Sequence, residues 1–157
     1  MNNRVRRASA ADEPQIQKIL ENRLQFLQAE ERPQFNWNKE TLKEELEIAQ
    51  VWIIETSEED HKAEIKAFLC FRVVPDAYEI TVLTTDPNAA RQGHQSNLLT
   101  KIKQLAQVEK KQIWLEVHAK NKPALELYKK NRFTISGTRN RYYKDGNDAI
   151  LMTFNPA

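Results

Sequence analysis

Glycine is scarce in this chain. Only three of its 157 residues are glycine, whereas average usage of about 7% would give roughly eleven. They are Gly93, Gly137 and Gly146, and no two lie within six residues of each other. Clustered glycines let the backbone approach a phosphate in the patterns G-x-G-x-x-G and G-x-x-x-x-G-K-[ST]. Their absence argues against a Rossmann dinucleotide site and against a P-loop.

Cysteine and histidine are also rare. The single cysteine, Cys70, lies in an apolar run and has no intrachain partner for a disulfide. The three histidines, His61, His94 and His118, are far apart in the sequence, so a zinc site of thiolate and imidazole ligands is not expected. We predict no metal site, and we expect His94 and His118 at the surface.

Long apolar runs are missing as well. No stretch approaches the about 20 apolar residues of a membrane span, and the N-terminal sequence Met-Asn-Asn-Arg-Val-Arg-Arg lacks the apolar core of a signal peptide. One domain over residues 1–157 is the default for this length. These features predict a soluble cytoplasmic protein without a membrane partner.

The net charge is only +2, which is too small to indicate a nucleic-acid-binding protein. Residues 1–80 carry 11 Lys and Arg against 16 Asp and Glu, a net −5, whereas residues 81–157 carry 13 against 6, a net +7. Chance placement of solvated charges is one explanation. The other is that the C-terminal half faces an anionic ligand and the N-terminal half a cationic one.

The periodicity of apolar residues predicts an α/β (α+β) chain. Helices are expected from Ser9 to about Glu30, from Lys39 to Gln50, from Gly93 to about Lys110 and from Asn121 to Asn131. Strands are expected at Val5–Arg7, Val51–Glu55, Ile65–Val74, Tyr78–Thr85, Gln112–His118, about Phe133–Tyr143 and Ala149–Phe154. The polar stretch Thr56–Lys62 is expected to be a hairpin turn. The order β-α-α-β-β-β-α-β-α-β-β predicts a mixed, mostly antiparallel central sheet flanked by about four helices.

The segment from Leu83 to Ser96 is a candidate binding site. A strand ends in a Thr-Thr-Asp-Pro turn, and Arg91-Gln92-Gly93-His94-Gln95-Ser96 then opens a helix. A helix N-terminus presents four unpaired N–H groups and about half a positive charge, which suits a pyrophosphate. Gly93 would allow the backbone to approach closely, and Arg91 adds positive charge. Most strand-to-helix turns bind nothing, so this pattern assigns no function by itself.

Residues 78–155 contain further motifs, in an order and at a spacing that match those of a known protein family. They are Thr85-Asp86-Pro87, Arg91-Gln92-Gly93, Trp114-Leu115-Glu116-Val117, Asn121…Ala124…Leu127-Tyr128, Phe133, Arg141-Tyr142-Tyr143 and Asp148-Ala149-Ile150-Leu151-Met152. The aromatic segment Phe35-Asn36-Trp37-Asn38-Lys39-Glu40 precedes them. On these residues the chain resembles the GNAT N-acetyltransferases, and among them the bacterial ribosomal-protein-alanine N-acetyltransferases. The resemblance implies a GNAT fold.

The resemblance also implies a cosubstrate, acetyl-CoA, and the residues that bind it. Leu83, Thr84 and Thr85 match the strand that pairs with the pantetheine arm of acetyl-CoA. The match to the pyrophosphate loop comprises Arg91, Gln92, Gly93, His94, Gln95 and Ser96. Asn121 matches a residue that contacts the cofactor arm. No metal is implied.

Two further residues take roles in acetyl transfer through the resemblance, Glu116 as general base and Tyr128 as general acid. These roles fit the chemistry, because a lysine-like amine (pKa about 10.4) is mostly protonated at neutral pH and an α-amine (about 8) less so. A carboxylate can remove that proton through water, and a tyrosine hydroxyl can protonate the departing thiolate. Without the resemblance, Glu116 would be read as a solvent-facing carboxylate and Tyr128 as a core residue.

Two positions depart from the family's loop pattern Q/R-x-x-G-x-G/A, namely Ala90 at its first position and Gln95 at its last. The Gln95 side chain either occupies the place where backbone should approach phosphate, or it points outward. The favoured function is acetylation of a primary amine, specifically a protein N-terminal α-amine such as that of a ribosomal-protein alanine. The alternatives are a small-amine or antibiotic acetyltransferase and, in another class, a non-catalytic acyl-CoA-binding regulatory module.

Overall fold

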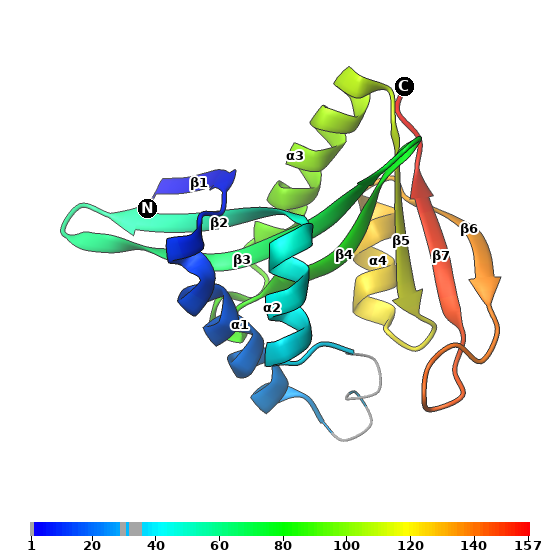
Figure 1. Cartoon of the computed structure of the whole chain (residues 1–157), viewed down its shortest axis with the longest axis horizontal. Coiled ribbons are helices and arrows are strands. Elements are labelled where there is room, and N and C mark those ends of the chain that lie inside the picture. Colours follow the sequence, from blue (N-terminus) through cyan, green and yellow to red (C-terminus); the bar gives the residue numbers. More distant parts are fainter. Residues whose placement is uncertain (1, 29–30, 32–35) are drawn as a thin grey trace.

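The fold is built on one mixed sheet in the order β1-β2-β3-β4-β5-β7-β6 (Figure 1). It is seen in a computed structural model that describes residues 2–28, 31 and 36–157. The strands are β1 (Asn2–Arg7), β2 (Gln50–Glu58), β3 (His61–Val74), β4 (Ala77–Thr85), β5 (Gln112–His118), β6 (Thr134–Arg139) and β7 (Ala149–Phe154). The helices are α1 (Glu13–Phe26), α2 (Lys39–Ile48), α3 (His94–Glu109) and α4 (Lys122–Lys130). This order confirms the predicted fold class.

Most neighbouring strands are antiparallel, and within the described residues only β4 and β5 run parallel. The predicted meander of three antiparallel strands is therefore confirmed as β2-β3-β4. A parallel pair needs a crossover connection, and α3 supplies it between β4 and β5. This single parallel pair places the end of β4 and the end of β5 at the same edge of the sheet.

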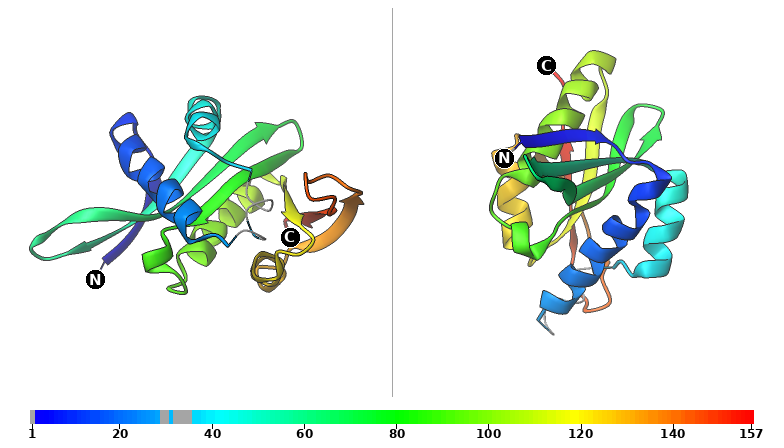
Figure 2. Two further views of the ribbon diagram at one scale, coloured as in Figure 1. Left: turned by 90° about the horizontal axis from the view of Figure 1, so that it is seen from below. Right: turned by 90° about the vertical axis from the view of Figure 1, so that its left-hand side faces the viewer.

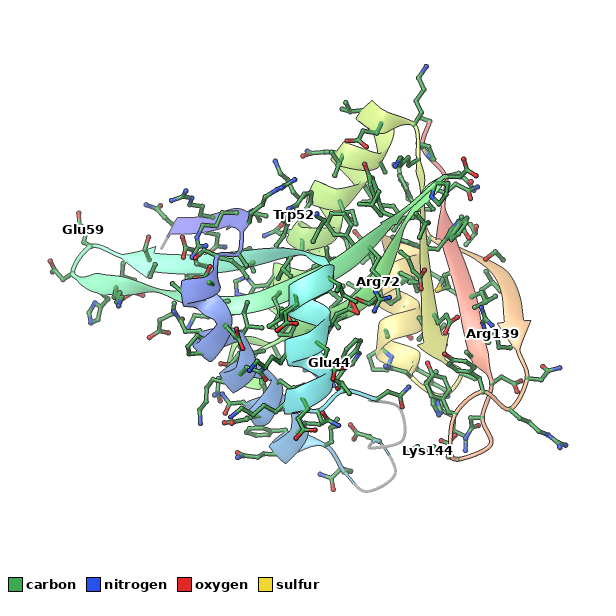
Figure 3. The ribbon with its side chains drawn as sticks, in the orientation of Figure 1. Glu44, Trp52, Glu59, Arg72, Arg139 and Lys144 are labelled. Carbon is green, nitrogen blue, oxygen red and sulfur yellow. The ribbon has the colours of Figure 1, made fainter. Side chains whose placement is uncertain are left out.

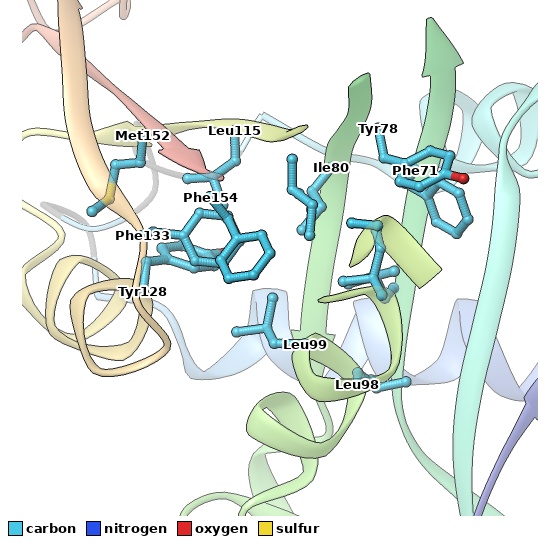
Figure 4. Packing of buried hydrophobic residues seen from close by; sticks show 14 of the residues in the cluster. Phe71, Tyr78, Ile80, Leu98, Leu99, Leu115, Tyr128, Phe133, Met152 and Phe154 are labelled. Carbon is cyan, nitrogen blue, oxygen red and sulfur yellow. The ribbon is translucent and has the colours of Figure 1, made fainter. Parts of the chain in front are cut away.

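The helices cover both faces of the sheet, with α1 and α2 on one side and α3 and α4 on the other (Figure 2). Each side has its own hydrophobic cluster, because successive side chains of a strand point to opposite faces. Ile16, Leu42 and Phe68 belong to the cluster under α1 and α2. The cluster under α3 and α4 is larger and includes Phe71, Tyr78, Leu115, Tyr128 and Phe133 (Figure 4).

Side-chain caps explain where two of the helices begin. The side-chain oxygen of Asn38 accepts a hydrogen bond from the Thr41 N–H at 2.9 Å, and that of Asn121 accepts one from Ala124 at 3.3 Å. Both residues are N-caps, as the sequence predicts. Ser9 instead precedes a 3₁₀ turn at Ala10–Asp12, which leads into α1.

Two local predictions need correction. The stretch Thr56–Lys62 is mostly strand, since β2 reaches Glu58 and β3 begins at His61, and the turn between them is confined to Glu59 and Asp60. The predicted strand to Tyr143 ends at Arg139, so Tyr142 and Tyr143 lie in the loop before β7. Arg141, whose φ is +51°, leaves the extended conformation there. Phe35 lies outside the described residues.

Candidate active site

The strands β4 and β5 are paired only where they begin. Their ladder joins Ala77–Glu79 to Gln112–Trp114. Beyond it the two strands spread apart toward their carboxyl ends (Figure 1), so in the described structure Ile80–Thr85 and Leu115–His118 make no ladder with each other. The facing edges therefore carry backbone N–H and C=O groups that are free to pair with an extended ligand.

A bulge in β4 gives a local reason for this separation. Cys70 of β3 pairs with Val82, and the next residue, Phe71, pairs with Ile80. Thr81 is thus an extra residue on β4, and its hydroxyl donates a hydrogen bond to the Cys70 carbonyl oxygen at 3.4 Å. A bulge bends its strand and increases the local twist, so β4 turns away from β5 after their short parallel ladder.

Two helices begin at the open edge. Because α3 follows the end of β4 and α4 follows the end of β5, both N-termini lie at the carboxyl ends of the parallel pair, where open α/β sheets bind ligands. Gly93 caps α3 with φ +80°, and a Cβ placed there would have no neighbour within 4 Å. Asn121 caps α4. The structure therefore brings the predicted loop Arg91–Ser96 and Asn121 to one edge of the sheet.

The side chains of the predicted loop differ in exposure. Arg91 and Gln92 are exposed, Gln95 and Ser96 are half-buried, and His94 is only 2% exposed. The expectation that His94 lies at the surface is therefore wrong, because its side chain, at the first position of α3, turns inward. Burial lowers the pKa of His94, and the charge of Lys66 lowers it further.

Buried polar atoms without partners gather near this loop. The hydroxyl oxygens of Thr84 and Thr85 and the Nδ1 atom of His94 have no hydrogen-bond partner among the described residues. Such groups are uncommon and call for an explanation, such as a ligand or an ordered water. Leu83 packs against the cluster under α3 and α4. By alternation Thr85 faces the α3 side, whereas the Thr84 side chain faces the α1 side.

Glu116 lies on β5 and faces the side of the sheet that carries α1 and α2. Its side chain is 31% exposed, and its Oε1 atom forms an ion pair with Nε of Arg139 at 2.8 Å. Figure 3 shows Arg139 on β6, next to β7. Tyr142 is the other neighbour. The charge of Glu116 raises the pKa of Tyr142, with further contributions from burial and from a hydrogen bond to Glu116.

Tyr128 lies on the opposite side of β5, within the cluster under α3 and α4. Its ring packs edge-on against Phe133 with 5.5 Å between centroids. Burial raises the pKa of Tyr128, and the neighbouring Tyr143 raises it further, so the hydroxyl keeps its proton at neutral pH. Glu116 and Tyr128 therefore lie on different faces of the sheet.

Tyr143 links these two residues, and the sequence did not single it out as a site residue. Burial raises the pKa of Tyr143 to about 12, with the charge of Glu116 as the next contribution. The charge of Glu116 raises the pKa of Tyr143, and Tyr143 in turn raises the pKa of Tyr128, so the three side chains influence one another electrostatically. Its neighbour His118 is only 1% exposed, which corrects the surface position expected for that histidine. The loop between β6 and β7 covers it.

Other parts of the described chain have fewer features of a binding site. An open recess of about 520 Å³ lies along α1 and reaches Lys39 of α2. None of the predicted site residues lines it. Among the described residues no group of three or more His, Cys, Asp or Glu side chains could hold a metal ion, and no helix has the length and apolar character needed to cross a membrane.

A mixed sheet that opens between its parallel strands, with helix N-termini at the opening, suits an extended ligand that carries a phosphate. The family model of the acetyltransferase (GNAT) family matches residues 16–133. The chain therefore belongs to the GNAT family and is an N-acetyltransferase, which confirms the predicted enzyme class. A search with the sequence finds no match among curated proteins.

Solved structures share the fold over nearly the whole chain. The ribosomal-protein-S18-alanine N-acetyltransferase of Escherichia coli is 25% identical, with a TM-score of 0.79, and the match covers 99% of this chain and 95% of that one. The NatC complex bound to Gag peptide and CoA contains a chain 17% identical, with a TM-score of 0.77 and 100% of both chains covered. NAA60 of Arabidopsis thaliana, in complex with a bisubstrate analogue, is 16% identical, with a TM-score of 0.76 and 99% and 98% covered.

Proposed function

We propose that this enzyme transfers an acetyl group from acetyl-CoA to a protein N-terminal α-amine, as the ribosomal-protein-alanine type does. The observation that carries the proposal is the open edge between β4 and β5, with the N-termini of α3 and α4 beside it. An extended arm can pair with the free backbone groups of such an edge, and a pyrophosphate suits a helix N-terminus.

The residues at this edge fit acetyl-CoA. The backbone of Leu83–Thr85 lies on the free edge of β4, the N–H groups of Arg91–Ser96 open α3, and Asn121 opens α4. The unpartnered Thr85 hydroxyl adds a polar group on the α3 side. Bound there, acetyl-CoA supplies the activated acetyl group. Gln95 is half-buried at the start of α3.

Glu116 and Tyr128 are proposed to move the protons. The Glu116 carboxylate, held by Arg139 and Tyr142, accepts a proton from the acceptor amine through water. The Tyr128 hydroxyl, whose pKa is raised by burial, keeps its proton and donates it to the leaving thiolate. The two residues lie on different faces of β5, which places the base on the solvent side and the acid on the core side of the open edge.

The acceptor is proposed to enter from the exposed face around Glu116. This face carries carboxylates at Glu79 and Glu116 and the exposed aromatic Tyr142, which suits the positively charged N-terminus of a peptide. The E. coli structural relative bears the name of an enzyme for the alanine of ribosomal protein S18. We therefore propose a ribosomal-protein N-terminus as acceptor, with no direct contact to nucleic acid.

Gly93→Ala is expected to weaken acetyl-CoA binding about tenfold. An L-residue in the left-handed region costs about 1–2 kcal/mol, and the added Cβ would project into the open space above the helix N-terminus. If binding has to restore this conformation, the dissociation constant rises by about a factor of ten. Isothermal titration calorimetry with acetyl-CoA measures it.

Gly146→Ala is the matched control for this variant. Gly146 has φ +82° and also has nothing within 4 Å of an added Cβ, so the backbone strain is equal. It lies in the loop between β6 and β7, away from the start of α3. Equal acetyl-CoA affinities in the two variants would contradict a pyrophosphate site at Gly93.

The acceptor is tested by mass spectrometry of peptides incubated with enzyme and acetyl-CoA. We expect acetylation of the α-amine of peptides that begin with alanine and continue with the N-terminal sequences of ribosomal proteins. The same peptides with a blocked N-terminus and an internal lysine should stay unmodified. Transfer to a panel of small amines, with none to the peptides, would favour the small-amine alternative instead.

A further inference from the structure

The loop between β6 and β7, residues 140–148, carries Tyr142 and Tyr143, and the charge of Glu116 raises the pKa of both tyrosines. Several of its hydrogen bonds are internal, such as those from the Tyr143 N–H to the Asn147 carbonyl at 3.1 Å and from the Gly146 N–H to the Tyr143 carbonyl at 2.9 Å. These bonds shape the loop but do not attach it to the sheet. Its position relative to Glu116 therefore depends on the few contacts that cross to β5.

The strongest side-chain contact between the loop and β5 is made by His118. This residue ends β5, its side chain is fully buried, and its Nε2 atom lies 2.8 Å from Oδ2 of Asp145 in the loop. Its ring also packs against Tyr143, with 4.6 Å between centroids. The Ala119 N–H adds a backbone bond to the Asp148 carbonyl oxygen at 2.9 Å.

The hydrogen bond to the second ring nitrogen shows which nitrogen of His118 carries the proton. Nδ1 accepts a hydrogen bond from the Lys120 N–H at 3.1 Å, so this atom carries no proton in the bonded arrangement. Nε2 then carries the proton and donates it to Asp145. With both ring nitrogens hydrogen-bonded, the buried imidazole has all of its polar atoms satisfied. Such a group orients its neighbours rather than exchanging protons with a substrate.

We propose that His118 is a positioning residue for acetyl transfer, acting as a latch that holds the loop of residues 140–148 against β5. With the latch closed, Tyr142 and Tyr143 stay beside Glu116, and the acceptor amine is received in one orientation. The inference rests on the proposed roles of Glu116 and Tyr128. It adds that acceptor binding depends on a hydrogen bond between two residues that do not touch the substrates.

Substitution of His118 by asparagine or by glutamine tests the two hydrogen bonds of the imidazole separately. The His118→Asn variant places an amide oxygen near the position of Nδ1 and keeps the acceptor for Lys120, but it cannot reach Asp145. The His118→Gln variant extends an amide N–H toward the position of Nε2 and keeps the donor to Asp145. We expect His118→Asn to raise the KM for the acceptor peptide about tenfold, because it loses one hydrogen bond to a charged group. His118→Gln should show only a small part of this increase in KM.

Asp145 provides the same test from the exposed side of the latch. The Asp145→Ala variant should match His118→Asn, whereas Asp145→Asn keeps an oxygen that accepts from Nε2 and should stay near the unmodified enzyme. Lys144→Ala, a change at the adjacent exposed residue (Figure 3), is the control. The acetyl-CoA dissociation constant should be unchanged in the three variants at positions 144 and 145, since these residues lie in the loop between β6 and β7 and not at the start of α3 or α4.

Amide hydrogen exchange gives a readout that does not depend on turnover. The N–H groups of Arg141, Tyr143 and Gly146 should exchange faster in His118→Asn and Asp145→Ala, and at the unmodified rate in the two conservative variants. An unchanged acceptor KM in Asp145→Ala, or equal impairment by His118→Gln and His118→Asn, would overturn the latch. If the unmodified enzyme acetylates no peptide, the proposed function fails, while unchanged loop exchange in Asp145→Ala would still overturn the latch.

Discussion

Glu116→Gln should lower kcat/KM for the acceptor peptide by at least about 100-fold while the enzyme stays folded. General base catalysis by a positioned side chain typically contributes about 10²–10⁴-fold to the rate, and glutamine cannot take up the proton. The fold should tolerate the change, because the ion pair with Arg139 is partly exposed and such pairs contribute about 0–1 kcal/mol. Initial rates with acetyl-CoA and a ribosomal-protein peptide, together with thermal unfolding, measure both quantities.

Two control variants separate a chemical role of Glu116 from a structural one. Arg139→Gln removes the same ion pair but leaves the carboxylate, so its rate should fall only a few-fold. Glu126→Gln removes an exposed carboxylate from α4, and its rate should not change. A loss in Arg139→Gln as large as that in Glu116→Gln would mean that the ion pair, and not a proton transfer, explains the effect.

The sequence was most informative where local pattern decides local structure. Apolar spacing predicts α3 through Leu98, Leu99 and Ile102, and all three are fully buried. Asn38 and Asn121 are short polar residues before helical patterns, and both cap helices. The alternation in β5 assigns Glu116 to the face opposite Leu115, as observed. In each case the residues that form the pattern lie close together in the sequence, within one or two turns of a helix or a few residues of a strand.

Predictions failed where a distant segment changes the environment of a residue. Alternation places His118 on the same face as the exposed Glu116, but the loop of residues 140–148 folds over it and buries it. The predicted strand to Tyr143 has suitable β-branched and aromatic residues, yet it ends at Arg139 because β7 offers partners only for Thr134–Arg139. Neither the loop nor the length of β7 can be derived from the residues they affect.

The opening between β4 and β5 also depends on distant segments and could not be predicted from the residues around it. The bulge at Thr81 is visible only when β4 is aligned with β3, and the short ladder of Ala77–Glu79 depends on how α3 returns the chain to β5. The family resemblance therefore identified Glu116 and Tyr128 together, but it could not place them on opposite faces of β5. That arrangement follows from tertiary packing, and it gives the proposed base access to solvent and the proposed acid a dry environment.

Tyr128→Phe should lower kcat about 10–100-fold without lowering stability. No hydrogen bond to the Tyr128 hydroxyl is found within the described part of the chain, and the ring contacts with Phe133 remain in phenylalanine. A residue that only fills the core would therefore show no effect on either property. Because burial raises the pKa of Tyr128 above its ordinary value, the hydroxyl keeps its proton at least up to about pH 10, and kcat should not fall through its ionisation below that pH.

Tyr78→Phe provides the opposite pattern in the same hydrophobic cluster. Burial and a hydrogen bond to Glu109 raise the pKa of Tyr78 to about 12, so removing this hydroxyl leaves a carboxylate without its donor. We expect a loss of about 1–2 kcal/mol in the free energy of unfolding with kcat unchanged, because Tyr78 lies at the closed end of the β4–β5 pair. Urea denaturation and initial rates should therefore give opposite results for the two variants. Tyr78→Phe should lose stability and keep its kcat, whereas Tyr128→Phe should keep its stability and lose kcat. A stable Tyr128→Phe enzyme with unmodified kcat would assign Tyr128 to the core alone, and the leaving thiolate would then take its proton from water at the open edge.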